Sequence, residues 1–215
     1  MALKVTAAAN GNPVLYLYGV VGESFTAEEV QQALRDIPSR QNIDVRIHSE
    51  GGSYTDSIAI NSTLRARQGK RSVYIDGLAA SGGSVIAMAG TSIEMANASW
   101  MMIHEAHGAM SGRAGDFRAA ADRLEAINNQ LVDIYKARWK GTEAELRKAI
   151  ADETWLNADN AIAAGLADKA TESLAIAACV NASKFFYNKV PRELTAEAIA
   201  EKLSAREARL AEALA

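Results

Sequence analysis

Short hydrophobic runs alternate along the chain with segments in which apolar positions recur at helical spacing. Runs rich in β-branched and aromatic residues predict strands, while apolar residues three and four positions apart predict helices. The predicted strands are Val14–Tyr18, Asp44–Ile47, Val73–Asp76, Ile93–Met95 and Trp100–Ile103. Strands that alternate with helices are typical of an α/β fold, which is the fold class we expect.

Helix-start signals support the same fold class. Two predicted helices open on a capping box, in which a threonine and a glutamate three residues later satisfy the first free N–H groups. These pairs are Thr26 with Glu29, and Thr142 with Glu145. A further helix is expected over about residues 54–67.

The clearest helical pattern covers about residues 116–140, with Asp116 as its expected cap. Its apolar positions follow one another at spacings of three and four: Phe117, Ala120, Leu124, Ile127, Leu131 and Ile134. A long helix with so narrow a stripe is expected to project from a small domain or to pack on a helix of a partner. The alternative is that the stripe packs within its own subunit.

Two glycine-rich loops follow predicted strands. Ser49-Glu-Gly-Gly-Ser53 lets the backbone approach a ligand, so it is either an anion or oxyanion site or simply a tight turn. In Ala79-Ala-Ser81-Gly-Gly-Ser84, a serine lies between small residues where a strand gives way to a helix. Ser81 is therefore a candidate nucleophile, with the Gly82 amide as an oxyanion donor. The competing interpretation is that Ser81 only caps the helix.

A nucleophilic serine needs a base, and the chain has three histidines. His104 follows the strand that ends at Ile103, where its side chain can leave the rim of the sheet. His48 precedes the first glycine loop and can face solvent or substrate, whereas His107 is expected on the surface.

An acid should fix the imidazole tautomer, and Asp152 and Glu153 are the candidates. Spacing alone does not show that these groups meet Ser81 and His104. A Ser–Lys mechanism through Lys70 is the other arrangement that the residues leave open.

Composition excludes several other classes. The formal charge of −3 and the pI of about 5.7 provide no basic field for nucleic acid. One cysteine, Cys179, allows neither a disulfide framework nor a cysteine zinc site. The sequence lacks a run of about 20 apolar residues and a basic, apolar leader, so we expect no membrane span and a cytoplasmic location.

Four segments in order resemble the proteolytic subunit of the Clp protease, especially phage-encoded relatives described as head maturation proteases. Residues 47–52 (Ile-His-Ser-Glu-Gly-Gly) resemble the family's I-N-S-P-G-G segment, and residues 77–83 resemble its G-x-A-A-S nucleophile segment. Residues 102–104 (Met-Ile-His) resemble its M-I-H segment. Residues 153–168 resemble the D-x-F-L-S-A block, and the whole resemblance runs from about residue 14 to 168.

This resemblance implies a ClpP-like, crotonase-like spiral of repeated ββα units with a long protruding handle helix. It also implies a nucleophile, a base, an acid and two oxyanion donors: Ser81, His104, Glu153, Gly52 and Gly82. Family members usually have aspartate as the acid, so Asp152 stays an alternative to Glu153. His48 and Glu50 replace the family's asparagine and proline, which alters the edge that binds the substrate strand.

The implied function is that of an ATP-independent serine endopeptidase, without metal or cofactor, that processes phage capsid or scaffold proteins during head maturation. Independence of an unfoldase is expected because the N-terminal portion is shorter than in housekeeping members. The implied partners are a protein or peptide substrate and further copies of the chain, which associate through their handle helices as a ring or as stacked rings. The implied location is the cytoplasm of a bacterial host or the phage procapsid.

Residues 1–172 are expected to form the peptidase domain and 173–215 a helical, scaffold-like C-terminal extension. Two other functions stay open: a non-enzymatic scaffold with a degenerate site, and a crotonase-type enzyme that acts on acyl-CoA through two backbone N–H donors and no triad.

Overall fold

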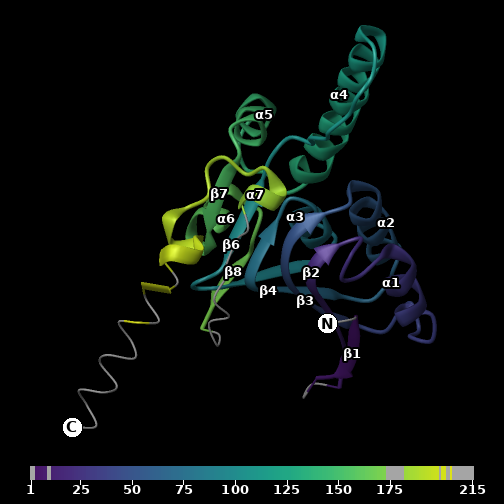
Figure 1. Cartoon of the computed structure of the whole chain (residues 1–215). Coiled ribbons are helices and arrows are strands. Elements are labelled where there is room, and N and C mark those ends of the chain that lie inside the picture. The colour runs from purple at the N-terminus through teal and green to yellow at the C-terminus, as the bar shows by residue number, and fades with distance from the viewer. Residues whose placement is uncertain (1–2, 9–10, 173–181, 199, 202–203, 205–215) are drawn as a thin grey trace.

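The computed structural model describes residues 3–8, 11–172, 182–198, 200–201 and 204. Within them, one eight-stranded sheet forms the centre of the molecule (Figure 1). Its strands are β1 (Lys4–Ala7), β2 (Pro13–Val21), β3 (Ile43–Gly52), β4 (Arg71–Ala80), β5 (Ser92–Ala96), β6 (Trp100–Ile103), β7 (Thr154–Asn157) and β8 (Lys169–Thr171). All five predicted strands are present, so the α/β prediction is confirmed. The short strands β1, β7 and β8 were not predicted.

The sheet divides at β4. The main path runs β1-β2-β3-β4-β5-β8, and it is parallel except where β1 meets β2. The first half of β4 pairs with β5, whereas its end, Leu78–Ala80, pairs in parallel with Trp100–Met102 of β6. β7 then pairs with β6 in antiparallel register. The carboxyl ends of β4 and β6 therefore lie side by side.

Helices α1, α2 and α3 lie beside the parallel strands (Figure 1). The helices are α1 (Ala27–Leu34), α2 (Tyr54–Arg65), α3 (Gly82–Ala87), α4 (Ala114–Lys136), α5 (Glu143–Ala151), α6 (Ala158–Ala164) and α7 (Ala182–Phe185), with a 3-10 turn η1 at Arg192–Leu194. The capping boxes of Thr26 and Thr142 are both formed, as predicted.

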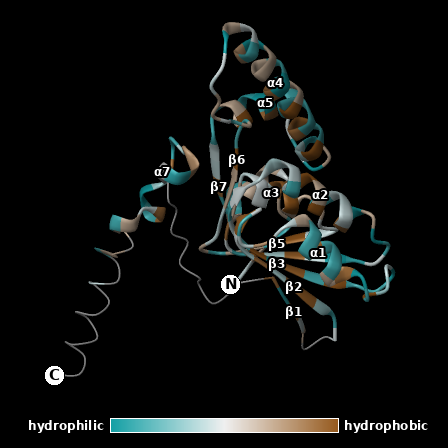
Figure 2. Cartoon of the chain, turned by 45° about the vertical axis from the view of Figure 1, so that its right-hand side comes forward, coloured by the Kyte–Doolittle hydropathy of each residue, from teal (hydrophilic) through white to brown (hydrophobic). Residues whose placement is uncertain are grey.

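The core lies between the helices and one face of the sheet. Alternate residues of the central strands point into it. Figure 2 shows hydrophobic stretches along these strands. Val45 and Ile47 of β3 are fully buried there beside Ile75 of β4, and Val30 of α1 and Leu64 of α2 join the same cluster.

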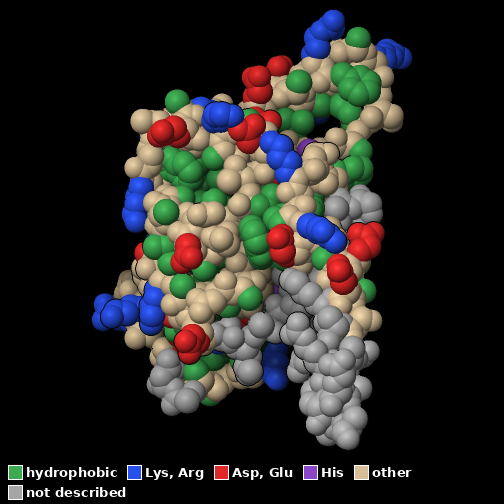
Figure 3. Space-filling view, turned by 90° about the vertical axis from the view of Figure 1, so that its left-hand side faces the viewer, with side chains coloured by type: hydrophobic (Ala, Val, Ile, Leu, Met, Phe, Trp, Pro, Cys, Tyr) green, Lys and Arg blue, Asp and Glu red, His purple; other side chains and the backbone are tan. Residues whose placement is uncertain are grey.

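Helix α4 projects from the body (Figures 1 and 3). The prediction that Asp116 caps it is wrong: the helix begins two residues earlier with Arg113 as the cap, and the Asp116 carboxylate accepts the Arg113 N–H at 2.7 Å. It also ends at Lys136 rather than near residue 140, because the chain turns there to donate the Lys140 N–H to the Ala164 carbonyl.

The apolar stripe of α4 divides between two environments. Leu131 near its C-terminal end is 5% exposed in the chain's own core, and Ile127 and Ile134 pack against that core. Phe117 near the free end is 51% exposed. The stripe thus packs within the subunit over its second half only.

Part of the expected C-terminal extension packs against the sheet. Phe185, Tyr187 and Leu194 form a buried cluster with residues at the ends of β4 and β6, among them Ala80 and Met102. Residues 173–181 and most of 202–215 lie outside the described residues, and the division of the chain at 172 stays a prediction.

Candidate active site

The pairing of β4 with β6 brings Ser81 and His104 together. Ala80 pairs with Met102, and the Ser81 N–H donates to the Met102 carbonyl at 2.9 Å. Each candidate residue thus lies just beyond the end of its strand. His104 Nε2 is 2.8 Å from Ser81 Oγ, a hydrogen bond in which the serine hydroxyl can donate to neutral imidazole.

The backbone holds Ser81 in an unusual conformation. Its φ is 51°, in the left-handed region that costs a non-glycine residue roughly 1–3 kcal/mol. Ser81 occupies the cap position of α3, but its side chain makes no capping hydrogen bond. The hydroxyl therefore faces His104 instead of serving the helix, contrary to the alternative that it is only a cap.

A buried hydroxyl network supports this turn. Ser84 Oγ lies at hydrogen-bonding distance from three oxygen atoms: the carbonyls of Ser81 (2.7 Å) and Met102 (2.9 Å) and the hydroxyl of Tyr135 (2.8 Å). Tyr135 belongs to α4 and is fully buried. The C-terminal end of α4 is thereby hydrogen-bonded to the turn that carries Ser81.

The glycines expected to hold an oxyanion lie next to each other. A Cβ on Gly82 would be 3.7 Å from the amide nitrogen of Gly52, and a Cβ on Gly51 would be 2.7 Å from Ser81 Cβ. Gly51 and Gly52 have φ of 97° and 135°, which side chains rarely adopt. Only glycine therefore allows β3 to approach the serine turn this closely.

The antiparallel register of β6 and β7 places Glu153 opposite His104, one position beyond the Ile103–Thr154 pair. Glu153 is 9% exposed and its φ is 52°. Burial would raise the pKa of its carboxyl, but hydrogen bonds from the main-chain N–H groups of Asn188 and Lys189 and from the Trp155 indole outweigh burial and lower it. Glu153 is thus held as a carboxylate.

Asp152 lies away from this arrangement. Its carboxylate is exposed, accepts a hydrogen bond from Lys148 Nζ and lies 3.6 Å from Lys189 Nζ. Of the two candidate acids, the structure brings Glu153 toward His104 and leaves Asp152 at the surface.

His104 is half-buried between aromatic neighbours. Its ring is 5.2 Å from that of His107 and 5.4 Å from that of Tyr187. Burial and then the His107 ring lower the pKa of His104 to about 4, against the opposing effect of Glu153. Its imidazole is therefore neutral at pH 7 and able to accept a proton. His107 is exposed, as expected, yet it contacts the base.

The remaining candidates lie elsewhere. His48 packs edge-on against Tyr18 at 5.8 Å, and its Nδ1 is buried without a hydrogen-bond partner. Lys70 precedes β4 whereas Ser81 follows it, so the full length of an extended strand separates them. The Lys70 amine therefore cannot reach the Ser81 hydroxyl, which excludes the Ser–Lys arrangement.

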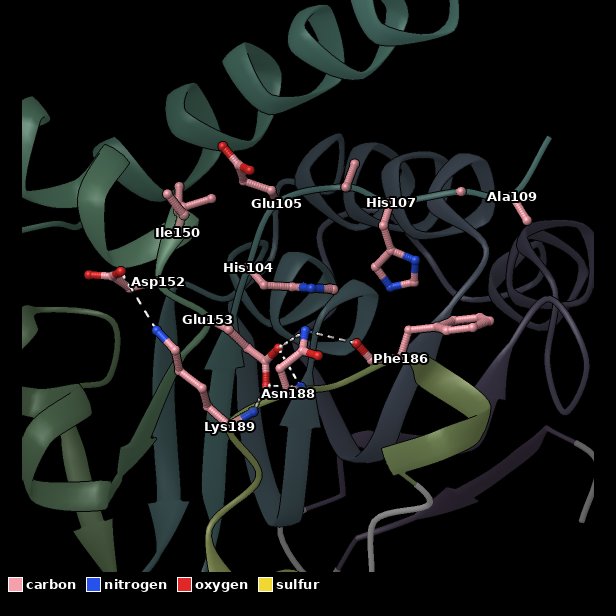
Figure 4. Close-up of a pocket in the computed structure, with 13 residues that line it drawn as sticks. His104, Glu105, His107, Ala109, Ile150, Asp152, Glu153, Phe186, Asn188 and Lys189 are labelled. Atoms are coloured by element: carbon pink, nitrogen blue, oxygen red, sulfur yellow. Dashed lines mark hydrogen bonds and ion pairs between the residues drawn. The ribbon is translucent and has the colours of Figure 1, made fainter. Parts of the chain in front are cut away.

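Two hollows flank the Ser81–His104 pair. One, of about 300 Å³, is lined by Gly52, Gly82, Leu131 and Tyr135 beside the serine. The other, of about 500 Å³, lies on the far side of His104, and Phe186, Asn188 and Lys189 of the C-terminal segment form part of its lining (Figure 4). Sequence reasoning missed these last three residues, which carry no motif.

Metal-binding clusters and membrane-spanning helices are both absent from the part of the chain that the structure describes. There, no group of three or more histidine, cysteine or carboxylate side chains is arranged to hold a metal ion. No described helix is both long and apolar enough to cross a membrane.

The family model for Clp protease matches residues 4–173. This chain belongs to the Clp protease family. Among solved structures, it resembles a ClpP1 mutant from Listeria monocytogenes with a TM-score of 0.67 and 19% sequence identity, over 74% of this chain and 91% of that one. This likeness confirms the ClpP-like, crotonase-like fold, and family membership implies a serine-type peptidase.

Proposed function

We propose that this chain is an ATP-independent serine endopeptidase in which Ser81 is the nucleophile, His104 the base and Glu153 the acid. The observation that carries the proposal is the 2.8 Å contact between Ser81 Oγ and His104 Nε2 at the ends of two paired strands. A neutral imidazole at this distance is what a general base requires.

The chemistry follows from this geometry. Ser81 Oγ attacks a peptide carbonyl while its proton passes to His104 Nε2, and the Gly52 and Gly82 N–H groups stabilise the oxyanion. His104 then protonates the leaving amine, and water releases the acyl group from Ser81 by the same steps. Glu153 stabilises the imidazolium, and the proposed reaction uses no cofactor.

We further propose that the substrates are phage capsid or scaffold proteins cut during head maturation. Support comes from the four segments that resemble phage-encoded members of the family. Handle-helix contacts between copies are proposed to build rings, because the free end of α4 exposes Phe117. Bacterial cytoplasm or the procapsid is the location that fits this role.

The test is intact-mass spectrometry after treatment with a fluorophosphonate. We expect one adduct on the wild type and on Ser111→Ala, which removes an exposed serine outside the site, and none on Ser81→Ala. Peptide hydrolysis should be lost together with the adduct. Hydrolysis that survives in Ser81→Ala would refute the assignment, and the absence of any adduct would favour a scaffold role or acyl-CoA chemistry at the two amides.

A further inference from the structure

Tyr187, from the C-terminal segment, lies directly on the Ser81–His104 pair. Its side chain is buried, with 7% exposed, and its ring meets that of His104 edge-on at 5.4 Å. The phenol hydroxyl donates to the main-chain carbonyl of Glu50, and its oxygen lies next to the Ser81 hydroxyl. A residue far along the chain thus touches both the proposed nucleophile and the proposed base.

The two residues after Tyr187 donate main-chain hydrogen bonds to the Glu153 carboxylate. The Asn188 N–H lies 2.8 Å from Oε2 and 3.0 Å from Oε1, and the Lys189 N–H donates to Oε1 at 2.7 Å. The Trp155 indole also donates to Oε1, at 3.1 Å. Among the hydrogen bonds of the described residues, none joins Glu153 to His104, so the carboxylate serves the C-terminal segment and not the imidazole.

The segment is anchored on both sides of these contacts. Phe185 stacks on Tyr187 at 5.6 Å, and both belong to the buried cluster with Ala80 and Met102. Trp155 of β7 meets Tyr187 edge-on at 5.7 Å. Apolar packing therefore holds the segment at the rim of the site. Its polar groups contact the candidate catalytic residues, with the Asn188 and Lys189 amides on Glu153.

The segment is not placed as a substrate. What contacts Ser81 is the phenol of Tyr187, which offers no carbonyl carbon for attack. Substrate main chain also has to reach the Gly52 and Gly82 amides, which line the other hollow. Tyr187 thus engages the nucleophile without presenting a bond to cleave.

We propose that residues 184–190 are an intramolecular inhibitor of this site, in which Tyr187 packs against Ser81 and His104 while the Asn188 and Lys189 amides keep Glu153 from His104. The inference rests on the proposed peptidase function. When the segment leaves, Ser81 loses the phenol contact and Glu153 loses two main-chain donors. The carboxylate is then free to accept the His104 Nδ1 hydrogen and stabilise the imidazolium.

The test uses the full chain and compares rates of Ser81 labelling by a fluorophosphonate. Tyr187→Phe keeps the ring and removes only the hydroxyl that binds Glu50 and lies next to Ser81. We expect labelling about five-fold faster, as the loss of one hydrogen bond suggests. Tyr187→Ala should label faster still, by about ten-fold or more. Arg192→Ala, an exposed change beyond the inhibitory segment, should label at the wild-type rate.

The outcomes separate the two proposals. Ser81-dependent labelling that is unchanged or slower in a Tyr187→Phe protein with the wild-type melting temperature would overturn inhibition while leaving the peptidase assignment intact. Slower labelling would mean that the segment completes the site. If Tyr187→Ala fails to fold, Tyr187→Phe decides alone, because it leaves no cavity. Labelling absent at Ser81 in every variant would instead overturn the peptidase function.

Discussion

His104 and Glu153 lie opposite each other at the first position beyond the antiparallel β6–β7 ladder. The ladder pairs Ile103 with Thr154, so its register selects Glu153 and turns its neighbour Asp152 away. Asp152 caps the C-terminal end of α5, and the Glu153 φ of 52° turns the chain from that helix into β7. The choice between the two adjacent acids is therefore made by this turn together with the β6–β7 pairing.

Glu153→Gln should reduce peptide hydrolysis by at least about 100-fold, because an amide cannot stabilise the imidazolium that forms on His104. Asp152→Asn changes the same chemistry one residue away, at an exposed side chain paired with Lys148, and should stay within about two-fold of the wild type. Steady-state hydrolysis in both the wild-type and Tyr187→Phe backgrounds measures this. A larger loss in Asp152→Asn than in Glu153→Gln would reverse the assignment.

Labelling of Ser81 should persist well below neutral pH. The pKa of His104 is about 4, lowered by burial and by His107 against the effect of Glu153, and the neutral imidazole is the active form above that value. The groups that face it are His107, Glu153, Ser81 and Tyr187. The fluorophosphonate labelling rate should therefore decline with a midpoint near pH 4.

Two variants test the origin of this pH dependence. His107→Gln removes a neighbour that lowers the His104 pKa, so its acidic limb should move to higher pH. Tyr187→Ala should move it in the same direction, since release of Glu153 strengthens its effect on the imidazole. A wild-type midpoint at the ordinary histidine value of about 6.5 would contradict the buried, neutral His104.

Much of this arrangement can be predicted from the sequence, and the reason is local. Strand-forming runs and capping boxes act over a few residues, so the central strands and the starts of α1 and α5 were predicted. The glycine loop and the small residues around Ser81 indicate a close backbone approach. The resemblance to the Clp protease family then supplied His104 as its partner.

What was missed depends on contacts between distant segments. Asn188 lies 35 residues after Glu153, and neither periodicity nor a turn signal links the two. The three-residue strand β8 and four-residue β7 exist because neighbouring strands offer an edge to pair with, which local pattern does not encode. Likewise, α4 ends at Lys136 because Lys140 bonds to the distant Ala164 carbonyl.

Gly51→Ala should lower the free energy of unfolding by about 2 kcal/mol or more. Alanine would have to adopt a φ of 97°, and its Cβ would lie 2.7 Å from Ser81 Cβ and 2.9 Å from the Ala80 carbonyl oxygen. Gly108→Ala is the matched control, since that added Cβ meets nothing within 4 Å. Equal denaturation midpoints for the two variants would show that β3 does not approach the serine turn so closely.

Assembly through α4 should depend on its free end. Phe117 is exposed and Leu124 is half-buried on the same apolar stripe, so arginine at both positions should lower the mass measured by light scattering. Ala119→Arg adds the same charge on the opposite side of the helix and should leave the mass unchanged. Leu131 is unsuitable for this test, because it is buried in the chain's own core and a charge there would destabilise the protomer. An assembly that survives the Phe117 and Leu124 changes in a folded protein would place the subunit contacts elsewhere.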